Sequence, residues 1–254
     1  MTVLLGLDFA DLDLVRAAAW LAERPATARF GYVVTPNADH LVRLHRRPEL
    51  APLYDGAMLR LLDSRAVVAM AGLFGLDRPP VVPGSDLIAL LLARYVRPNE
   101  RITIVGLHPA WLPALTMRCN LAPPAHFDPP AGFADDVSAI AAAVAFVLCH
   151  PARFVFLAVG SPGQEKLAAA IAATGLATGT GLCIGAGLEF LAGARRRAPR
   201  WMQAAGLEWL FRLAGEPRRL ARRYLIDCPV VVPLLLAQRK ARWGRMRAVV
   251  GSKR

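Results

Sequence analysis

The sequence contains only four cysteines, and they form no recognisable pattern. Cys119, Cys149, Cys183 and Cys228 are widely scattered, without a CxxC pair and without a paired spacing against the five histidines. This distribution indicates neither a zinc site nor a disulfide framework, and a reducing compartment fits best. The cysteines and histidines thus give no sign of a metal cofactor.

The sequence also lacks a secretory signal and a long apolar run. The N-terminus reaches acidic residues by Asp8 without a basic region before it, so it is not expected to be a signal peptide. The longest uncharged stretch covers the 22 residues 167–188, and repeated Gly and Thr interrupt it. This stretch is predicted to form a helix, a turn and a buried strand, and no transmembrane helix is expected.

Acidic residues are scarce near the C-terminus. Residues 194–254 hold 16 basic and 3 acidic residues, whereas residues 1–193 are nearly neutral within a chain of net charge +12. This split predicts a catalytic or binding domain over residues 1–193 and a basic appendage over residues 194–254 that meets a polyanion. Charge alone leaves both nucleic acid and an anionic membrane surface open as that polyanion.

The composition is that of a folded α/β protein. Hydrophobic residues make up 55% of the 254 residues, far too many for a disordered chain. Continuous apolar runs at 30–34, 101–105, 154–159 and 181–184 are typical of strands buried on both faces of a parallel sheet. Helical patterns lie between these runs, as at 135–149 and 164–173. The alternation predicts a doubly wound α/β fold, whose ligands bind beyond the carboxyl ends of the strands.

Distinctive residues follow the expected strands and continue into the basic tail. They are TPNADH (35–40), Asp63-Ser64, PGSDL (83–87), GSPGQE (160–165), GAGLEFLAG (185–193), RAPRWMQ (197–203), GLEWLFRL (206–213), EPRR (216–219) and RRY (222–224). Each segment is a weak signal, but their order is specific, and together they resemble the WecG/TagA/CpsF glycosyltransferases (glycosyltransferase family 26) over nearly the whole chain.

The resemblance implies a Rossmann-like α/β domain with a C-terminal appendage. It further implies an inverting, metal-independent hexosyl transfer from a UDP-sugar to a polyprenyl-diphosphate-linked saccharide. The expected place is the cytoplasmic face of the bacterial inner membrane, where the enzyme would be peripheral. The products of such enzymes serve the synthesis of exopolysaccharide, capsule, teichoic acid or common antigen.

The resemblance also assigns roles to two groups near the expected strand ends. Asp63 matches the proposed general base, and Thr35 and Asn37 match a motif whose hydroxyl and amide can bind substrate; we expect Thr35 and Asp63 to be catalytic. The alternative for Asp63 is a cap on a helix that begins near Arg65. Pro and Asn are also ordinary loop formers, which is the alternative for the other two positions.

Two further segments are expected to bind substrate. Gly84, Ser85 and Asp86 suit a phosphate at a helix N-terminus, although Asp86 also suits a plain first-turn charge. Gln164 and Glu165 are assigned to nucleotide or sugar binding, with a solvated first-turn glutamate as the alternative.

The chain departs from the family at Ser64, where Gly is usual, at Leu188, where Phe is usual, and at Glu189, where Asp is usual. Glu189 is expected to contact the nucleotide. Its side chain is longer than that of the usual aspartate, so the carboxylate would reach a different position. The three departures also raise the alternative of a catalytically inactive relative. The neighbouring glycines do not complete a GxGxxG dinucleotide motif, because Phe190 stands where glycine is required.

The tail mixes arginines with large apolar residues at helical spacing. This pattern suits an interfacial helix whose apolar residues, Trp209 and Phe211 among them, enter the headgroup region while its cations meet anionic lipid. Arg218, Arg222 and Arg223 are expected to grip the acceptor or donor diphosphate. The alternative is an ordinary surface helix with its rings in the core. A nucleic-acid-binding protein is the other function class considered, but no known motif supports it, so no nucleic-acid partner is expected.

Two metal-like patterns are discounted. Asp11 and Asp13 formally match a DxD motif, but they precede a helical run where acidic residues serve as caps. His40 and His45 lie five residues apart in an expected helix, a spacing that does not place them on one face.

Overall fold

The computed structural model describes residues 1–199, 201–202 and 205–251, and its centre is a six-stranded, all-parallel sheet. The strand order is β4-β3-β8-β7-β5-β6. The strands are β3 (Gly31–Val34), β4 (Leu59–Arg60), β5 (Ile102–Gly106), β6 (Ala125–Phe127), β7 (Phe154–Ala158) and β8 (Thr180–Cys183). A separate antiparallel hairpin of β1 (Thr2–Leu4) and β2 (Leu7–Phe9) precedes them.

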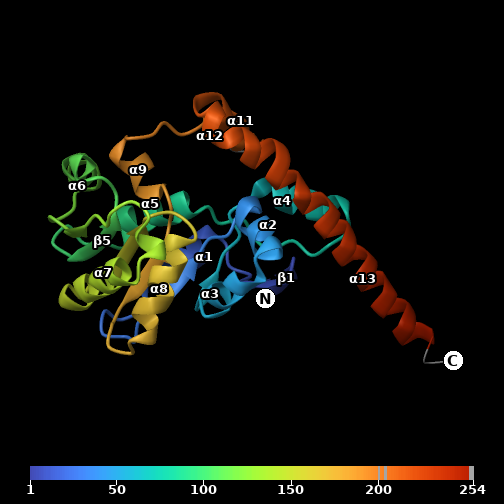
Figure 1. The fold of residues 1–254 in the computed structure, drawn as a ribbon, viewed down its shortest axis with the longest axis horizontal. Coiled ribbons are helices and arrows are strands. Elements are labelled where there is room, and N and C mark those ends of the chain that lie inside the picture. The colour runs from blue at the N-terminus through green and yellow to red at the C-terminus, as the bar shows by residue number, and fades with distance from the viewer. Residues whose placement is uncertain (200, 203–204, 252–254) are drawn as a thin grey trace.

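Helices cover both faces of the sheet (Figure 1). One face carries α2 (Ala38–Arg46), α3 (Ala51–Asp55), α4 (Arg65–Leu73), α7 (Val137–Cys149) and α8 (Gly163–Ala173). The other face carries α1 (Leu14–Ala22), α5 (Gly84–Arg94), α6 (Leu112–Cys119) and α9 (Gly187–Ala192). Short 3-10 turns lie at η1 (Pro48–Leu50), η2 (Pro109–Trp111) and η3 (Phe133–Asp135). This arrangement confirms the predicted doubly wound, Rossmann-like α/β fold.

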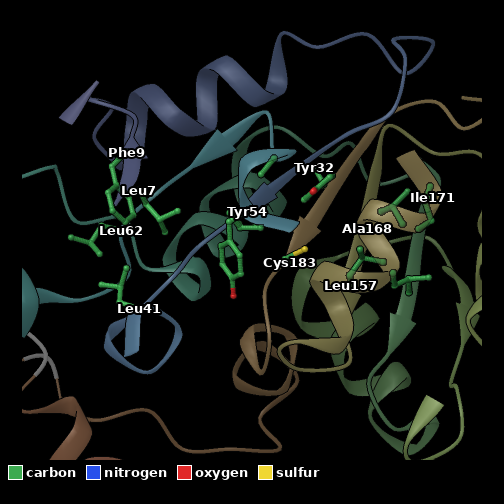
Figure 2. Close-up of a cluster of buried hydrophobic side chains, with 14 of the residues drawn as sticks. Leu7, Phe9, Tyr32, Leu41, Tyr54, Leu62, Leu157, Ala168, Ile171 and Cys183 are labelled. Atoms are coloured by element: carbon green, nitrogen blue, oxygen red, sulfur yellow. The ribbon is translucent and has the colours of Figure 1, made fainter. Parts of the chain in front are cut away.

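The continuous apolar runs form strands because both of their faces are buried. In β3, Tyr32 and Val34 enter one hydrophobic core while Val33 enters the other. Figure 2 shows the first core, which the N-terminal hairpin, the strands and the covering helices share. Its labelled residues are Leu7, Phe9, Tyr32, Leu41, Tyr54, Leu62, Leu157, Ala168, Ile171 and Cys183. The cleft described below therefore rests on a sheet that is fixed from both sides.

The predicted helix, turn and strand over residues 167–188 are also confirmed. This stretch contains the end of α8, a turn, the fully buried β8 and the start of α9. In the part of the chain that is described, no helix combines the length and the apolarity that crossing a membrane requires.

The basic C-terminal segment crosses the molecule and then runs along it. Its helices are α11 (Glu208–Gly215), α12 (Pro217–Arg222), the π-helix η4 (Arg223–Asp227), η5 (Cys228–Val230) and α13 (Val231–Gly251). In Figure 1, α11 and α12 lie above the body, and the end of α13 projects beyond it.

The beginning of α13 is part of the core of the protein. Val231 and Leu235 are fully buried in the first core. The Gln238 side-chain oxygen accepts the Leu5 N–H of the hairpin at 2.8 Å, and Arg242 lies 3.2 Å from the Asp77 carboxylate. The C-terminal segment is thus packed against the rest of the chain over this length.

Candidate active site

A cleft of about 870 Å³ lies beyond the carboxyl ends of the parallel strands. Thr35 and Asn37 follow β3, Gly106 ends β5, Ser161 follows β7, and Gly185 follows β8. Residues of α11 and the segment after it, including Phe211, Arg212 and Glu216, line the cleft as well. This is the edge where doubly wound proteins bind their ligands.

Close packing at the floor of the cleft depends on a glycine. A Cβ atom on Gly84 would lie 2.7 Å from the Thr35 hydroxyl oxygen, closer than such atoms approach. Because Gly84 is the first residue of α5, its missing side chain lets the beginning of this helix reach the loop after β3.

Asp63 stands beside that loop and that helix. The chain continues past β4 by pairing along β3, and the Asp63 N–H donates to the Pro36 carbonyl at 2.9 Å. One carboxylate oxygen of Asp63 accepts the Gly84 N–H at 3.3 Å. The helix that begins at Arg65 is capped by Ser64 instead, whose hydroxyl accepts the Val67 N–H at 3.2 Å. The geometry therefore gives the cap to Ser64 and leaves Asp63 facing the cleft.

The surroundings of Asp63 disfavour its ionised form. Burial raises its pKa from 3.8 to about 7, while the Arg212 guanidinium and the Gly84 N–H oppose that rise. The carboxylates of Glu208 and Asp86 add a smaller upward shift of the pKa. An aspartate with this pKa exchanges a proton near neutral pH, as a general base must.

Thr35 and Asn37 line the cleft in positions set by local hydrogen bonds. The Thr35 hydroxyl donates to the Cys183 carbonyl of β8 at 3.4 Å. The Asn37 side chain caps α2 by accepting the Asp39 N–H at 3.0 Å, and the His40 ring completes the capping box. His40 lines the cleft too, and the described residues contain no cluster of three metal-binding side chains.

Gln164 and Glu165 occupy different positions although they are neighbours. Gln164 lines the cleft, and its side-chain oxygen accepts the Gly185 N–H at 2.8 Å. Its amide donates to one oxygen of Glu165 at 2.9 Å. Glu165 is 1% exposed behind the cleft wall, and burial raises its pKa. The solvated-glutamate alternative is therefore wrong, and Glu165 is placed to orient Gln164.

Two predicted substrate-binding carboxylates form ion pairs with arginines of the C-terminal segment. Asp86 pairs with Arg197, and it does not line the cleft. Glu189 lines the cleft and pairs with Arg195, which also pairs with Glu216. These contacts join α5 and α9 to the chain that crosses above the cleft.

The cations of the cleft differ from those expected in the sequence. Arg43, Arg195, Arg196 and Arg212 line the cleft, and Arg196 has no ion-pair partner among the described residues. Arg212 lies within the GLEWLFRL segment, and its place beside Asp63 could not be predicted from the sequence because it depends on the tertiary fold. Arg218 and Arg222 are exposed on α12 and line neither cavity described for this protein. The Arg223 side chain lies outside the described part of the structure.

Nearly the whole chain, and not only the cleft, matches a known family. A model of the glycosyl transferase WecG/TagA/CpsF family matches residues 2–245. The chain belongs to this family. The resemblance carried by the motifs is thereby confirmed, and the cleft is the candidate active site of a WecG/TagA/CpsF glycosyltransferase.

A second, smaller cavity adjoins the cleft of this WecG/TagA/CpsF glycosyltransferase. It measures about 380 Å³ and shares four lining residues with the cleft: Asn37, Asp39, Asp63 and Arg212. Its other walls come from α4, from α11 and from the chain around η5. Asp63 is thus reached from two cavities.

The aromatic residues of the C-terminal segment have divided roles. Trp209 lines the second cavity and Phe211 lines the cleft, so both residues face cavities of the protein and not only a membrane. Among the side chains of this segment that the structure describes, the large apolar ones that are exposed are Trp201, Leu210, Leu225, Ile226, Leu236 and Trp243. Asp13 caps α1, as expected from its place before a helix, and neither Asp11 nor Asp13 lines the cleft.

Proposed function

We propose that this WecG/TagA/CpsF glycosyltransferase moves a hexosyl group from a UDP-sugar to a polyprenyl-diphosphate-linked saccharide with inversion. The product would serve bacterial cell-surface polysaccharide synthesis. The observation that carries the proposal is Asp63, a carboxylate with a pKa of about 7 at the junction of two cavities. One base and one place for a diphosphate are what an inverting transfer requires.

The proposed step needs no covalent enzyme intermediate. Asp63 takes the proton of the acceptor hydroxyl as that oxygen forms a bond to the anomeric carbon of the donor. The bond from that carbon to the UDP oxygen breaks, and its electron pair leaves with UDP. Thr35, with its hydroxyl at the same floor of the cleft, is assigned to holding the sugar.

Arginines of the cleft supply the charge that the departing diphosphate needs. Arg196 is exposed in the cleft and forms no ion pair with another described residue, so we assign its guanidinium to bidentate binding. Arg212 places a second cation next to Asp63. We assign these two residues to the diphosphate, and we keep Asn37, Ser85, Gln164 and Glu189 as sugar or nucleotide contacts because they line the cleft.

Membrane attachment is assigned to the exposed part of the C-terminal segment. Leu225 and Ile226 follow the exposed cations Arg218 and Arg222, an arrangement that suits the headgroup boundary of an anionic membrane. This would place the enzyme on the cytoplasmic face of the inner membrane as a peripheral protein.

The family assignment favours this function over nucleic-acid binding, and an assay separates an active enzyme from an inactive relative. A panel of UDP-sugars is incubated with a short-chain prenyl-diphosphate-linked saccharide, and UDP release, product mass and anomeric configuration are measured. We expect one UDP-sugar to give a product of inverted configuration, also in the presence of EDTA. Absence of product with every donor would refute the proposal.

The base is tested by replacing Asp63 with Asn. We expect Asp63→Asn to lower turnover by about two to four orders of magnitude, with UDP binding retained, because only proton transfer is removed. Asp55→Asn is the control, since Asp55 is an exposed aspartate on α3. Near-normal turnover of the Asp63 variant would remove this residue from the mechanism.

A further inference from the structure

We propose that the second cavity binds the diphosphate-proximal end of the acceptor's prenyl chain, so that donor and acceptor reach Asp63 from separate cavities. The inference rests on the proposed function. It adds a place for the lipid that the motifs do not indicate.

The two cavities meet at one carboxylate. Asp63 lines both of them, together with Arg212, Asn37 and Asp39, and the remaining lining residues differ. A transfer with inversion needs the acceptor oxygen and the departing diphosphate on opposite sides of the anomeric carbon. Two cavities that converge on the base allow this arrangement without crowding both substrates into one cleft.

The walls of the second cavity suit a hydrocarbon. They are formed largely by apolar side chains, which are Met70, Val81, Pro83, Trp209, Pro229 and Val232. The polar part of the lining consists of Asn37, Asp39, Asp63, Ser64, Arg65, Glu208 and Arg212, and Arg212 forms an ion pair with Glu208 at 2.5 Å. The cavity volume of about 380 Å³ lies within the range of small-ligand sites, roughly 300–1,000 Å³. This volume suits the beginning of a prenyl chain and leaves the remainder outside.

The cavity lies next to apolar surface along the chain. Cys228 and Pro229 of η5 form part of its wall, and Leu225 and Ile226 of the preceding η4, which are 61% and 62% exposed, are separated from η5 by Asp227 alone. A prenyl chain leaving the cavity here would meet the surface that we assign to the membrane. The lipid would therefore remain in an apolar environment while its sugar reaches the base.

The first test fills the cavity. Met70→Trp introduces a larger side chain on the cavity wall of α4, and Leu73→Trp is the matched control, because Leu73 lies on the same helix and is 81% exposed. We expect Met70→Trp to raise the KM for the prenyl-linked acceptor at least tenfold and to leave the Kd for UDP unchanged. Leu73→Trp should change neither value. A folded Met70→Trp enzyme with an unchanged acceptor KM, or one with weakened UDP binding, would overturn the inference.

The second test uses the unaltered protein, so it holds even if Met70→Trp fails to fold. Cys228 lines the cavity, and the rate at which a maleimide labels it is followed by mass spectrometry of its peptide. Farnesyl diphosphate should slow the labelling of Cys228 and leave that of the exposed Cys149 unchanged, whereas UDP should slow neither. Equal labelling of Cys228 with and without farnesyl diphosphate would contradict lipid binding in this cavity.

Different results would disprove the proposed function and the lipid assignment. If no UDP-sugar is transferred to any prenyl-linked acceptor, the proposed function itself is wrong. If transfer occurs while the cavity-filling variant and the labelling experiment show no effect, only the assignment of the second cavity is wrong.

Discussion

Burial of the Asp63 side chain raises its pKa to about 7, and this shift links the folding of the protein to pH. The folded protein holds the Asp63 proton more tightly than the unfolded chain does, for which 3.8 is the reference pKa. The stabilisation from this proton is fully present below pH 4 and is lost as the pH rises through 7. A residue suited to accept a proton at neutral pH thus destabilises the fold at that pH.

Asp63→Asn should therefore become more stable relative to the wild type as the pH rises. We expect nearly equal melting temperatures at pH 4 and a higher melting temperature for the variant at pH 8, because asparagine has no charge to bury. Its side-chain oxygen can still accept the Gly84 N–H. Thermal unfolding across this pH range is the measurement, with Asp55→Asn as the control; a difference that does not grow with pH would contradict the raised pKa.

The contact between Gly84 and Thr35 gives a second residue-scale prediction. In Gly84→Ala, the new Cβ would meet the Thr35 hydroxyl at 2.7 Å, and we expect a destabilisation of about 1–3 kcal/mol from overpacking. In a Thr35→Ala background the same substitution should cost clearly less, because the opposing atom is gone. Denaturant unfolding of the four proteins in this double-mutant cycle measures the difference. Equal costs in the two backgrounds would show that the Thr35 side chain does not limit the approach of α5.

At the scale of the elements, ion pairs hold the segment around Arg195 and Arg197, which crosses above the cleft, against α5 and α9. Arg197 pairs with Asp86 of α5, and Arg195 joins Glu189 of α9 to Glu216. Most of these side chains are only partly exposed, so their ion pairs are less screened by solvent than surface pairs. They fix α11, and with it Arg212 and Phe211, over the site.

Removing this attachment should loosen α11 before it affects the sheet. In the double variant Asp86→Asn, Glu189→Gln we expect amide hydrogen exchange in α11 to accelerate by about tenfold, which corresponds to roughly 1.4 kcal/mol. Exchange in β7 should not change. Glu49→Gln, which breaks an exposed pair with Arg47, is the control. Unchanged protection of α11 in the double variant would show that packing alone holds this helix.

The buried strands could be predicted from the sequence, because both of their faces are apolar. The edge strands could not: β4 has only two residues, and all three residues of β6 are half-buried, so neither has a continuous buried run.

At the site, sequence motifs placed Asp63, Thr35 and Asn37 at the cleft. They did not reveal that Arg197 pairs with Asp86, 111 residues away, since such a contact depends on the tertiary fold.

In the whole molecule, one part of the C-terminal segment belongs to the hydrophobic core and another part extends from the surface. Val231 and Leu235 are buried against the body, whereas the end of α13 extends away from it (Figure 1). The boundary at residue 194 that charge suggested is thus not a boundary of packing. A deletion from residue 194 onward would uncover part of the first hydrophobic core.

Two truncations should therefore behave differently. Deletion of residues 194–254 is expected to give an unstable, aggregating protein, because apolar surface around Val231 and Leu235 loses its cover. Deletion of residues 244–254 removes four basic residues and should leave the body folded while weakening binding to anionic vesicles, at about 1 kcal/mol per cation near the surface. Thermal melting and vesicle sedimentation measure the two effects, with neutral vesicles as the control. Unchanged sedimentation of the shorter deletion would place the electrostatic contact elsewhere.

The hydrogen bond from Leu5 to Gln238 joins residues that are 233 positions apart. During synthesis on the ribosome, the N-terminal hairpin emerges long before the helix that covers it. The hairpin and α13 cannot pack together until α13 has left the exit tunnel. Docking of α13 on the hairpin is thus expected to follow the synthesis of all six strands of the sheet.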